Sequence, residues 1–224
     1  MNFRYPIFLD LTGKRCVVTG AGPEIAAKIR GLVEACADVV YVNPDASPEI
    51  AVLVETGSIR WQEREFQPED LDGCFLAITA RPDNGEVFRL AEERKILCNA
   101  PDDPEHCRFS FGSVHRQGDL TIAISTNGFA PALAVRLRQR LERDIGPEYG
   151  MLVELLKEVR PEISARIPEF AARRDLWYQI VDSGALSAVR EGHPERAAGM
   201  IREMIENAAS STSHSDTSGD GAGQ

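Results

Sequence analysis

The sequence has little of what membrane, secreted and metal-binding proteins require. No run approaches the roughly 20 consecutive apolar residues of a membrane helix, and the first residues show neither the apolar core nor the cleavage site of a signal peptide. The five cysteines include no Cys-x-x-Cys pair or other metal-ligand spacing. We therefore expect a cytoplasmic protein with reduced cysteines and no metal site.

An excess of positive charge is also absent. The 224-residue chain has a formal net charge of -10, which argues against nucleic acid or an anionic membrane as a partner, because both attract basic faces. What the chain does have is 43% hydrophobic residues, enough for a substantial core. These features indicate a globular protein that is neither fibrous nor wholly disordered.

Short β-rich runs alternate with helical periods in the first half of the chain, which is typical of a parallel sheet covered by helices. Strands are expected at 15–19, 38–42, 59–62, 74–79 and 96–98, and helices at 24–35, 48–55 and 86–94. The predicted fold class is therefore α/β, with a Rossmann-like doubly wound parallel sheet in residues 1–114.

The pattern changes after Asn99. Residues 100–118 are rich in turn formers and charge, and a strand (119–125) and a helix that opens at Pro131 follow. We interpret 115–150 as a small strand-helix segment and 151–209 as a helical module that is broken near Pro161, Pro168 and 192–194. Residues 210–224 carry no apolar side chain larger than alanine, which predicts a disordered tail.

Gly20-Ala21-Gly22 stands between the first strand and the first helix. Glycines at this position permit a tight turn and let backbone amides approach a pyrophosphate, whose charge the helix amino terminus favours. The third glycine of the dinucleotide-binding fingerprint is missing, because Ile25 and Ala26 occupy that region. A dinucleotide site is the leading interpretation, and a plain tight turn is the alternative.

Polar residues follow other strands of the predicted sheet. Asn43-Pro44-Asp45 comes after the second strand, where NAD-binding sheets often place an acid for the ribose hydroxyls, and Thr79 ends the fourth. Asp102, after the fifth strand, should overhang the same crevice, where a carboxylate can exchange protons. A solvated acidic turn is the alternative for Asp102.

Two further motifs lie in the second half. The turn Ser125-Thr126-Asn127-Gly128 precedes a helix that carries Arg136, and such a turn binds carboxylate or phosphate well. A solvated helix face is the alternative for the arginines. Arg173-Arg174 precede the aromatic pair Trp177-Tyr178, which we interpret as core or interface packing.

The order and spacing of these motifs resemble those of the precorrin-2 dehydrogenase and sirohydrochlorin ferrochelatase family. The same module also forms the amino-terminal half of siroheme synthases. The resemblance extends from Pro6 to about Asn207. The segments that carry it are 5–11 (YPIFLDL), 20–26 (GAGPEIA), 98–104 (CNAPDDP), 118–126 (GDLTIAIST) and 131–134 (PALA).

The resemblance implies a homodimer with 115–150 as its dimerisation segment. It also implies that the protein oxidises precorrin-2 to sirohydrochlorin with NAD as hydride acceptor. In some members ferrous iron is then inserted to give siroheme. The family's key aspartate falls on Asp102, and its serine in the turn before the long helix falls on Thr126. Its NAD contacts fall near Pro23 and Glu24, and near Pro44 and Asp45; we add Gly20, Gly22, Asn43 and Thr79 to the expected cofactor site. The expected substrate site is Ser125, Thr126, Asn127, Gly128 and Arg136.

Some positions depart from the family pattern. Asn127-Gly128 stands where paired glycines are common, Phe129-Ala130 replaces a small polar pair, and the loop after the fourth strand contains Arg81, which could face a phosphate. These departures leave two alternatives open: a sirohydrochlorin chelatase without dehydrogenase activity, or a non-catalytic module that binds a nucleotide or tetrapyrrole. His106 and His115 are candidate helpers in metal insertion.

Overall fold

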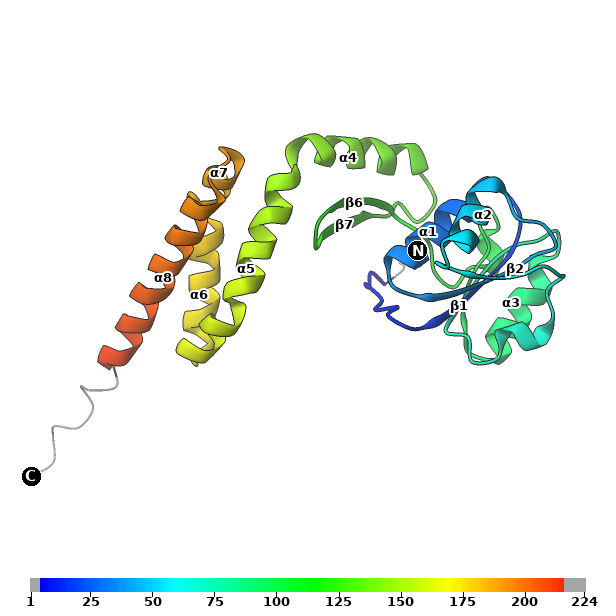
Figure 1. The fold of residues 1–224 in the computed structure, drawn as a ribbon, viewed down its shortest axis with the longest axis horizontal. Coiled ribbons are helices and arrows are strands. Elements are labelled where there is room, and N and C mark those ends of the chain that lie inside the picture. The colour runs from blue at the N-terminus through cyan, green and yellow to red at the C-terminus, as the bar shows by residue number, and fades with distance from the viewer. Residues whose placement is uncertain (1–4, 216–224) are drawn as a thin grey trace, which may run out of the picture. The chain divides into compact units, whose positions relative to one another are not determined.

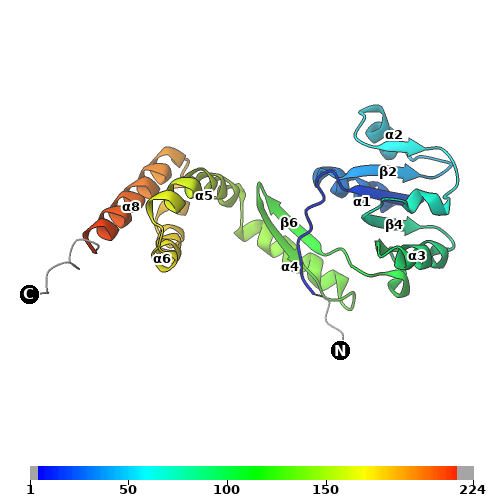
Figure 2. The same cartoon turned by 90° about the horizontal axis from the view of Figure 1, so that it is seen from below.

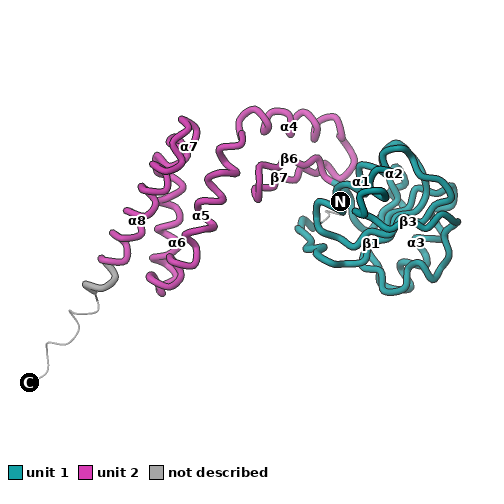
Figure 3. The backbone as a smooth tube through the Cα atoms, viewed as in Figure 1, with its two compact units in different colours: residues 1–111 teal, residues 112–224 magenta. Residues whose placement is uncertain are grey.

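The computed structural model describes residues 5–215, and the chain forms two compact units, Met1–Phe111 and Gly112–Gln224 (Figure 3). In the described range no helix has the length and apolar character that a membrane span requires.

Unit 1 contains β1 and β2, which are labelled in Figure 1. They belong to a five-stranded parallel sheet with the strand order β3-β2-β1-β4-β5. The strands are β1 (Arg15–Gly20), β2 (Asp38–Val42), β3 (Arg60–Gln62), β4 (Leu76–Ala80) and β5 (Leu97–Asn99). The helices are α1 (Ile25–Glu34), α2 (Pro48–Glu55) and α3 (Asn84–Glu93), with short 3-10 turns η1 (Pro68–Leu71) and η2 (Pro104–His106). This arrangement confirms the predicted Rossmann-like sheet.

The central strands bury both faces, which explains their near-continuous apolar sequences. Alternate residues of β1 enter different cores: Val18 packs with Ile29 of α1, whereas Val17 packs with Val87 of α3 on the other face. The chain leaves β1 toward β2 and returns to the opposite side of β1 with β4. The topological switch point, where open α/β sheets bind their ligands, therefore lies between the carboxyl ends of β1 and β4.

Unit 2 begins with an antiparallel hairpin of β6 (Ser113–Gln117) and β7 (Leu120–Ile124), against which α4 (Pro131–Asp144) packs (Figure 2). A helical core follows, made by α5 (Pro147–Arg166), α6 (Phe170–Val181), α7 (Ala185–Arg190) and α8 (Pro194–Ser215). Ile163, Ile180 and Ile201, from three different helices, are completely buried in this core.

Three expectations about unit 2 were wrong. Strand β6 was read as turn, because only one of its five residues, His115, is buried and the apolar alternation is missing. The expected break at Pro161 does not occur: the proline lies inside α5 on the exposed side, while Ile163 anchors the helix to the core. The predicted tail begins as helix, because α8 continues to Ser215, whereas residues 216–224 lie outside the described residues.

The helical core generates a stability prediction. Ile180 is fully buried and its neighbour Val181 is 52% exposed on the same helix. We expect Ile180→Ala to lower the free energy of unfolding by about 2 to 5 kcal/mol through lost apolar contact and a residual cavity. The matched control Val181→Ala should change it by less than about 0.5 kcal/mol. Urea denaturation followed by circular dichroism measures both, and equal effects would contradict the assigned core.

Candidate cofactor and substrate sites

The glycine turn lies where β1 comes closest to β4. Gly20 has φ +92°, and a Cβ atom there would stand 2.3 Å from the carbonyl oxygen of Ala80 and 2.8 Å from the amide nitrogen of Arg81. Such distances admit only glycine. The carboxyl ends of the two strands therefore meet backbone to backbone at the switch point.

The next glycine leaves the amino terminus of α1 open. Gly22 has φ +151°, and no atom lies within 4 Å of the position that its Cβ would take. Glu24 is the cap residue of α1, but its side chain accepts no cap hydrogen bond, and Pro23 and Glu24 are both exposed. The turn therefore offers open space and helix-terminal amides, which suits the pyrophosphate of a dinucleotide.

A buried phenol ties the end of β2 to the glycine turn. The hydroxyl of Tyr41 lies 3.1 Å from the carbonyl oxygens of both Gly20 and Asp45, and the Asn43 amide donates to the Asp45 carbonyl at 2.7 Å. Burial, and then the charge of Asp45, raise the pKa of Tyr41, so the phenol stays a donor at neutral pH. These bonds hold Pro44 and the exposed Asp45 side chain at the edge where the ribose acid was expected.

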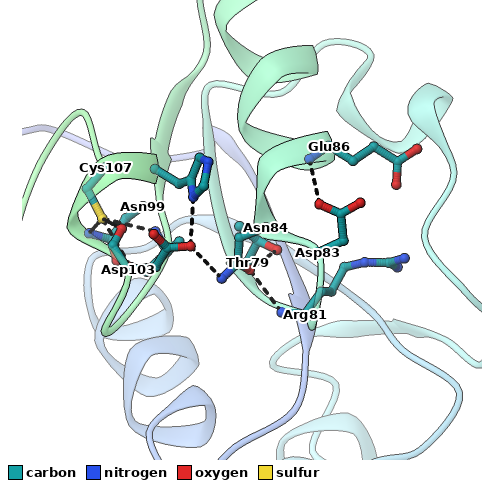
Figure 4. A network of polar contacts seen from close by, with 10 residues as sticks. Thr79, Arg81, Asp83, Asn84, Glu86, Asn99, Asp103 and Cys107 are labelled. Atoms are coloured by element: carbon teal, nitrogen blue, oxygen red, sulfur yellow. Dashed lines mark hydrogen bonds and ion pairs between the residues drawn. The ribbon is translucent and has the colours of Figure 1, made fainter.

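A polar network joins β4, α3 and the loop after β5 (Figure 4). Thr79 is fully buried, and its hydroxyl donates to the side-chain oxygen of Asn84, which also accepts from the backbone amide of Arg81. The amide nitrogen of Asn84 donates to Asp103 at 3.2 Å. The Thr79 hydroxyl therefore acts at the carboxyl edge of the sheet by holding the side chain of Asn84, to which it donates its hydrogen bond.

Asp102 is an exposed residue of this loop. Asp103 N donates to Ala100 O, which makes Pro101 and Asp102 the two central residues of a β-turn, and Asp102 has φ +62°. Proline suits the first central position, and aspartate is among the residues that tolerate a positive φ at the second. Its carboxylate has no hydrogen-bond or ion-pair partner among residues 5–215, so it is free to meet a ligand.

Asp103 is the opposite case. Its Oδ2 atom lies 2.7 Å from His106 Nδ1 in addition to the bond from Asn84. The hydrogen bond with His106 is the largest cause that holds the pKa of Asp103 below its usual value. The His106 ring also packs edge-on against Phe88, with 5.3 Å between ring centroids. His106 therefore serves the loop's internal structure.

Cys107 closes the same loop from inside. Its thiol lies within 3.1–3.4 Å of the carbonyl oxygens of Ala100 and Asp103, the Ala100 amide and the Asn99 amide group. The other atom of that group, Asn99 Oδ1, is buried and has no partner among the described residues. The loop that presents Asp102 is thus held in place by its own chain.

Arg81 turns toward another loop. Its guanidinium pairs with Glu65 at 3.3 Å and lies over the ring of Phe66, 5.5 Å from the centroid. Because the guanidinium is paired with a carboxylate and lies over an aromatic ring, the structure does not support the suggestion that Arg81 faces a phosphate.

The expected substrate residues lie in unit 2, between β7 and α4. Phe129 N donates to Thr126 O, so Asn127 (φ +52°) and Gly128 (φ +83°) are the two central residues of a β-turn. Asparagine followed by glycine suits two positive φ values. The replacement of paired glycines by Asn127-Gly128 therefore preserves the conformation of the turn. The side chain of Phe129, the last residue of the turn, is 91% exposed.

The hydroxyl groups of the turn accept hydrogen bonds from the turn's own backbone. Ser125 Oγ accepts from Asn127 N at 3.1 Å, and Thr126 Oγ1 accepts from Ala130 N at 3.2 Å. Arg136 is exposed on α4 and donates to Gln139. His115 is buried elsewhere in unit 2, with Nε2 2.8 Å from Ile145 O, which is a structural contact.

Sequence reasoning missed Tyr41, Asn84 and Asp103 as organisers of the edge. The sequence identifies Tyr41 only as a strand residue. The tertiary structure is needed to show that its hydroxyl reaches the carbonyl oxygens of Gly20 and Asp45. A signal for Asn84 was present: Asp83, three residues before Glu86, is a helix cap, and its carboxylate accepts from Glu86 N. Helix α3 therefore begins at Asn84, two residues before the expected start.

The five-stranded order, the glycine turn at the switch point and the open end of α1 define unit 1 as a dinucleotide-binding domain of the Rossmann type. Family comparison agrees, because residues 7–113 match a family described as NAD(P)-binding. Residues 117–144 match "Sirohaem biosynthesis protein central" and residues 148–205 match "Sirohaem synthase dimerisation region".

Two curated relatives align with most of this chain. The chain is 33% identical over 204 residues to a siroheme synthase of Photorhabdus laumondii, covering 90% of this chain and 43% of the relative. It is 35% identical over 211 residues to a siroheme synthase of Thioalkalivibrio sulfidiphilus, covering 93% and 42%. The chain thus spans less than half the length of these relatives, and it is similar to them over 90% or more of its own length.

A solved structure has the same fold. "SirC, precorrin-2 dehydrogenase" aligns with a TM-score of 0.72 and 23% identity, covering 91% of this chain and 100% of that one. This likeness extends the shared fold through both units.

The Gly20 contact generates a prediction with a matched control. Gly57 also has a positive φ (+69°) but open space around its Cβ position. Gly57→Ala should cost about 1 to 2 kcal/mol of stability for the conformation alone. Gly20→Ala should cost more, because Ala80 must move, and should also weaken NADH binding. Urea denaturation and NADH fluorescence titration measure the two effects; identical behaviour of the variants would show that the close approach is unimportant.

Proposed function

We propose that this protein oxidises precorrin-2 to sirohydrochlorin with NAD as the hydride acceptor. The observation that carries the proposal is the pairing, at one carboxyl edge of unit 1, of an open glycine turn with an exposed and unpartnered carboxylate, Asp102. The names of the relatives, siroheme synthases, and of the structural neighbour, a precorrin-2 dehydrogenase, support the choice of substrate.

The residues of unit 1 suit the cofactor. Bound NAD supplies the hydride acceptor for the oxidation. Gly20 and Gly22 would let the backbone approach the pyrophosphate, and the amides after Pro23 and Glu24 would donate to its oxygens. At the end of β2, the Asp45 carboxylate would accept from ribose hydroxyls, and the Asn43 side chain, which donates to the Asp45 carbonyl, would hold the backbone beside Pro44 in place.

In this mechanism Asp102 handles the proton. Oxidation of precorrin-2 removes two hydrogens: one leaves a carbon as hydride, and the other leaves as a proton. The exposed Asp102 carboxylate accepts that proton and passes it to water. Asp103 takes no proton, because its hydrogen bonds with His106 and Asn84 favour the charged form.

The turn of unit 2 recognises the substrate in this proposal. Precorrin-2 carries many carboxylates, which the amides around Asn127 and Gly128 and the guanidinium of Arg136 can bind. The hydroxyls of Ser125 and Thr126 hold the shape of the turn. Segment 115–150, together with the residues 148–205 that match a dimerisation region, forms the contact of a homodimer in the cytoplasm, where the cysteines stay reduced.

Ferrous iron is a further substrate in this scheme, inserted into sirohydrochlorin. Two N–H groups of the macrocycle lose their protons to water as its nitrogens become the final ligands of the iron, so the reaction needs no cluster of metal-binding side chains. Within residues 5–215 there is no group of three or more His, Cys, Asp or Glu side chains that could hold a metal ion.

An anaerobic absorbance assay tests the activity. We expect NAD-dependent formation of the sirohydrochlorin spectrum together with NADH, followed by a further change when ferrous iron is added. Absence of oxidation by protein that binds NADH would contradict the dehydrogenase. An iron-dependent change without NAD, on supplied sirohydrochlorin, would favour the chelatase alternative.

Asp102 and its neighbour provide a matched pair for the mechanism. Asp102→Asn should lower kcat by about 100-fold or more while NADH affinity stays unchanged, because only the proton acceptor is lost. Asp103→Asn removes an equal charge one residue away and should act mainly through loop order, with the pH profile of kcat unchanged. Equal losses of kcat in both variants would remove Asp102 from the proposed role.

The homodimer generates its own prediction. Sedimentation velocity of the full chain should give the mass of two copies, near twice 24.6 kDa, at micromolar concentration. A single 24.6 kDa species under those conditions would contradict the proposed assembly.

A further inference from the structure

Lys28 of α1 carries a positive charge that the mechanism above does not use. Its ammonium lies over the ring of Phe111, 4.2 Å from the ring centroid, and it has no ion-pair partner among residues 5–215. Attraction between a cation and an aromatic face holds the charge in place without neutralising it. The charge of Lys28 therefore has a defined position and is available to an anion.

Lys28 is located one turn inside the open end of α1. Residues four apart share a face of a helix, so Lys28 lies on the same face as Glu24, the cap residue. Long side chains on a helix lean toward its amino terminus. We therefore expect the ammonium to extend toward the end of α1, where Gly22 leaves open space. This is the end at which the pyrophosphate would meet the helix-terminal amides.

Phe111 is positioned by contacts that begin at the carboxyl end of β5. Asn99, the last residue of β5, donates from its side chain to the carbonyl oxygen of Phe109 at 2.8 Å. The ring of Phe109 packs against the core that includes α1, and it meets the ring of Phe111 edge to face with 5.3 Å between centroids. A series of contacts therefore joins the ligand-binding edge of the sheet to Lys28.

Two arginines near this edge already have carboxylate partners. Arg64 follows β3 and pairs with the buried Asp70 at 2.6 Å, and Arg81 follows β4 and pairs with Glu65 at 3.3 Å. The edge also carries exposed carboxylates, which repel a pyrophosphate. The ammonium of Lys28 can offset this repulsion, because no carboxylate among residues 5–215 is paired with it.

We propose that Lys28 binds the pyrophosphate of the dinucleotide, with its ammonium donating to a phosphate oxygen while Phe111 holds the side chain in place. This inference rests on the proposed function, because it names a further cofactor-binding residue for the same reaction. Lysine binds phosphate as a compact point charge. It adds a charged side-chain contact to a site that the glycine turn and the α1 amides build from backbone.

Titration of NADH fluorescence in the full-length protein, without precorrin-2, tests the contact. We expect Lys28→Gln to weaken NADH binding by about tenfold or more, because a charge-assisted hydrogen bond is lost. Lys28→Arg keeps the charge and should retain affinity within about threefold of the unchanged protein. Equal losses in the Gln and Arg variants would contradict a role for the charge.

The matched control is Arg30→Gln, which removes the same charge from the same helix. Arg30 is exposed and lies about 200° further round α1 than Lys28, on the other side of the buried stripe formed by Ile25 and Ile29. Its loss should change NADH affinity by no more than about twofold, since its charge acts only through a screened field. Equal weakening by the Arg30 and Lys28 changes would overturn the proposal.

Phe111→Leu tests the support of the lysine. The variant keeps the ammonium but removes the aromatic face beneath it, so NADH binding should weaken by about two- to fivefold. An unchanged affinity would contradict the positioning role assigned to the ring.

A carboxylate of the substrate is the competing partner of Lys28. If Lys28→Gln leaves NADH affinity unchanged and raises the KM for precorrin-2, Lys28 binds the substrate and the proposal fails. ADP-ribose, measured in competition with NADH, keeps the pyrophosphate but lacks the nicotinamide. It should lose as much affinity as NADH in the Gln variant, and an unchanged affinity for ADP-ribose would place Lys28 at the nicotinamide and overturn the proposal.

The NAD-dependent assay separates failure of this proposal from failure of the proposed function. Weaker NADH binding in Lys28→Gln, together with no oxidation by the unchanged protein, would contradict the dehydrogenase alone. Normal oxidation by the unchanged protein, together with full NADH affinity in the variant, would contradict the Lys28 contact alone.

Discussion

The backbone contact between Gly20 and Ala80 is the constraint on which the proposed cofactor site depends. It brings the carboxyl ends of β1 and β4 together, and it leaves no room for a side chain between them. Tyr41 then joins β2 to the same point, because its hydroxyl reaches the Gly20 and Asp45 carbonyls. An open helix end and a fixed strand end thus stand side by side, and a dinucleotide needs both of these features.

The two adjacent aspartates of the loop after β5 have different environments. Asp103 faces inward and accepts hydrogen bonds from Asn84 and His106, which hold the loop against α3. Asp102, one residue earlier, occupies a positive-φ turn position and remains in solvent. Asp103 therefore supports the loop, while the Asp102 carboxylate has no partner among residues 5–215. This difference follows from the turn geometry, since the two side chains are chemically the same.

Much of unit 1 could be predicted from the sequence because its elements are locally encoded. Strand β2 and helix α2 occupy the expected residues, and the buried strands carry apolar runs that only a two-sided core requires. The elements of unit 2 were harder to predict from the sequence. Strand β6 has one buried residue, and Pro161 continues a helix whose opposite face is anchored by Ile163, so packing overrides the local signal in both places.

The sequence by itself determined the alternation of strands and helices, the glycine turn and the Asn127-Gly128 turn, because each depends on the conformational preferences of adjacent residues. Only the tertiary structure decided that Thr79 serves Asn84, that Arg81 pairs with Glu65, and that Lys28 lies over the ring of Phe111. Those contacts join residues from different elements, and a side chain's partner across space is set by how the elements pack.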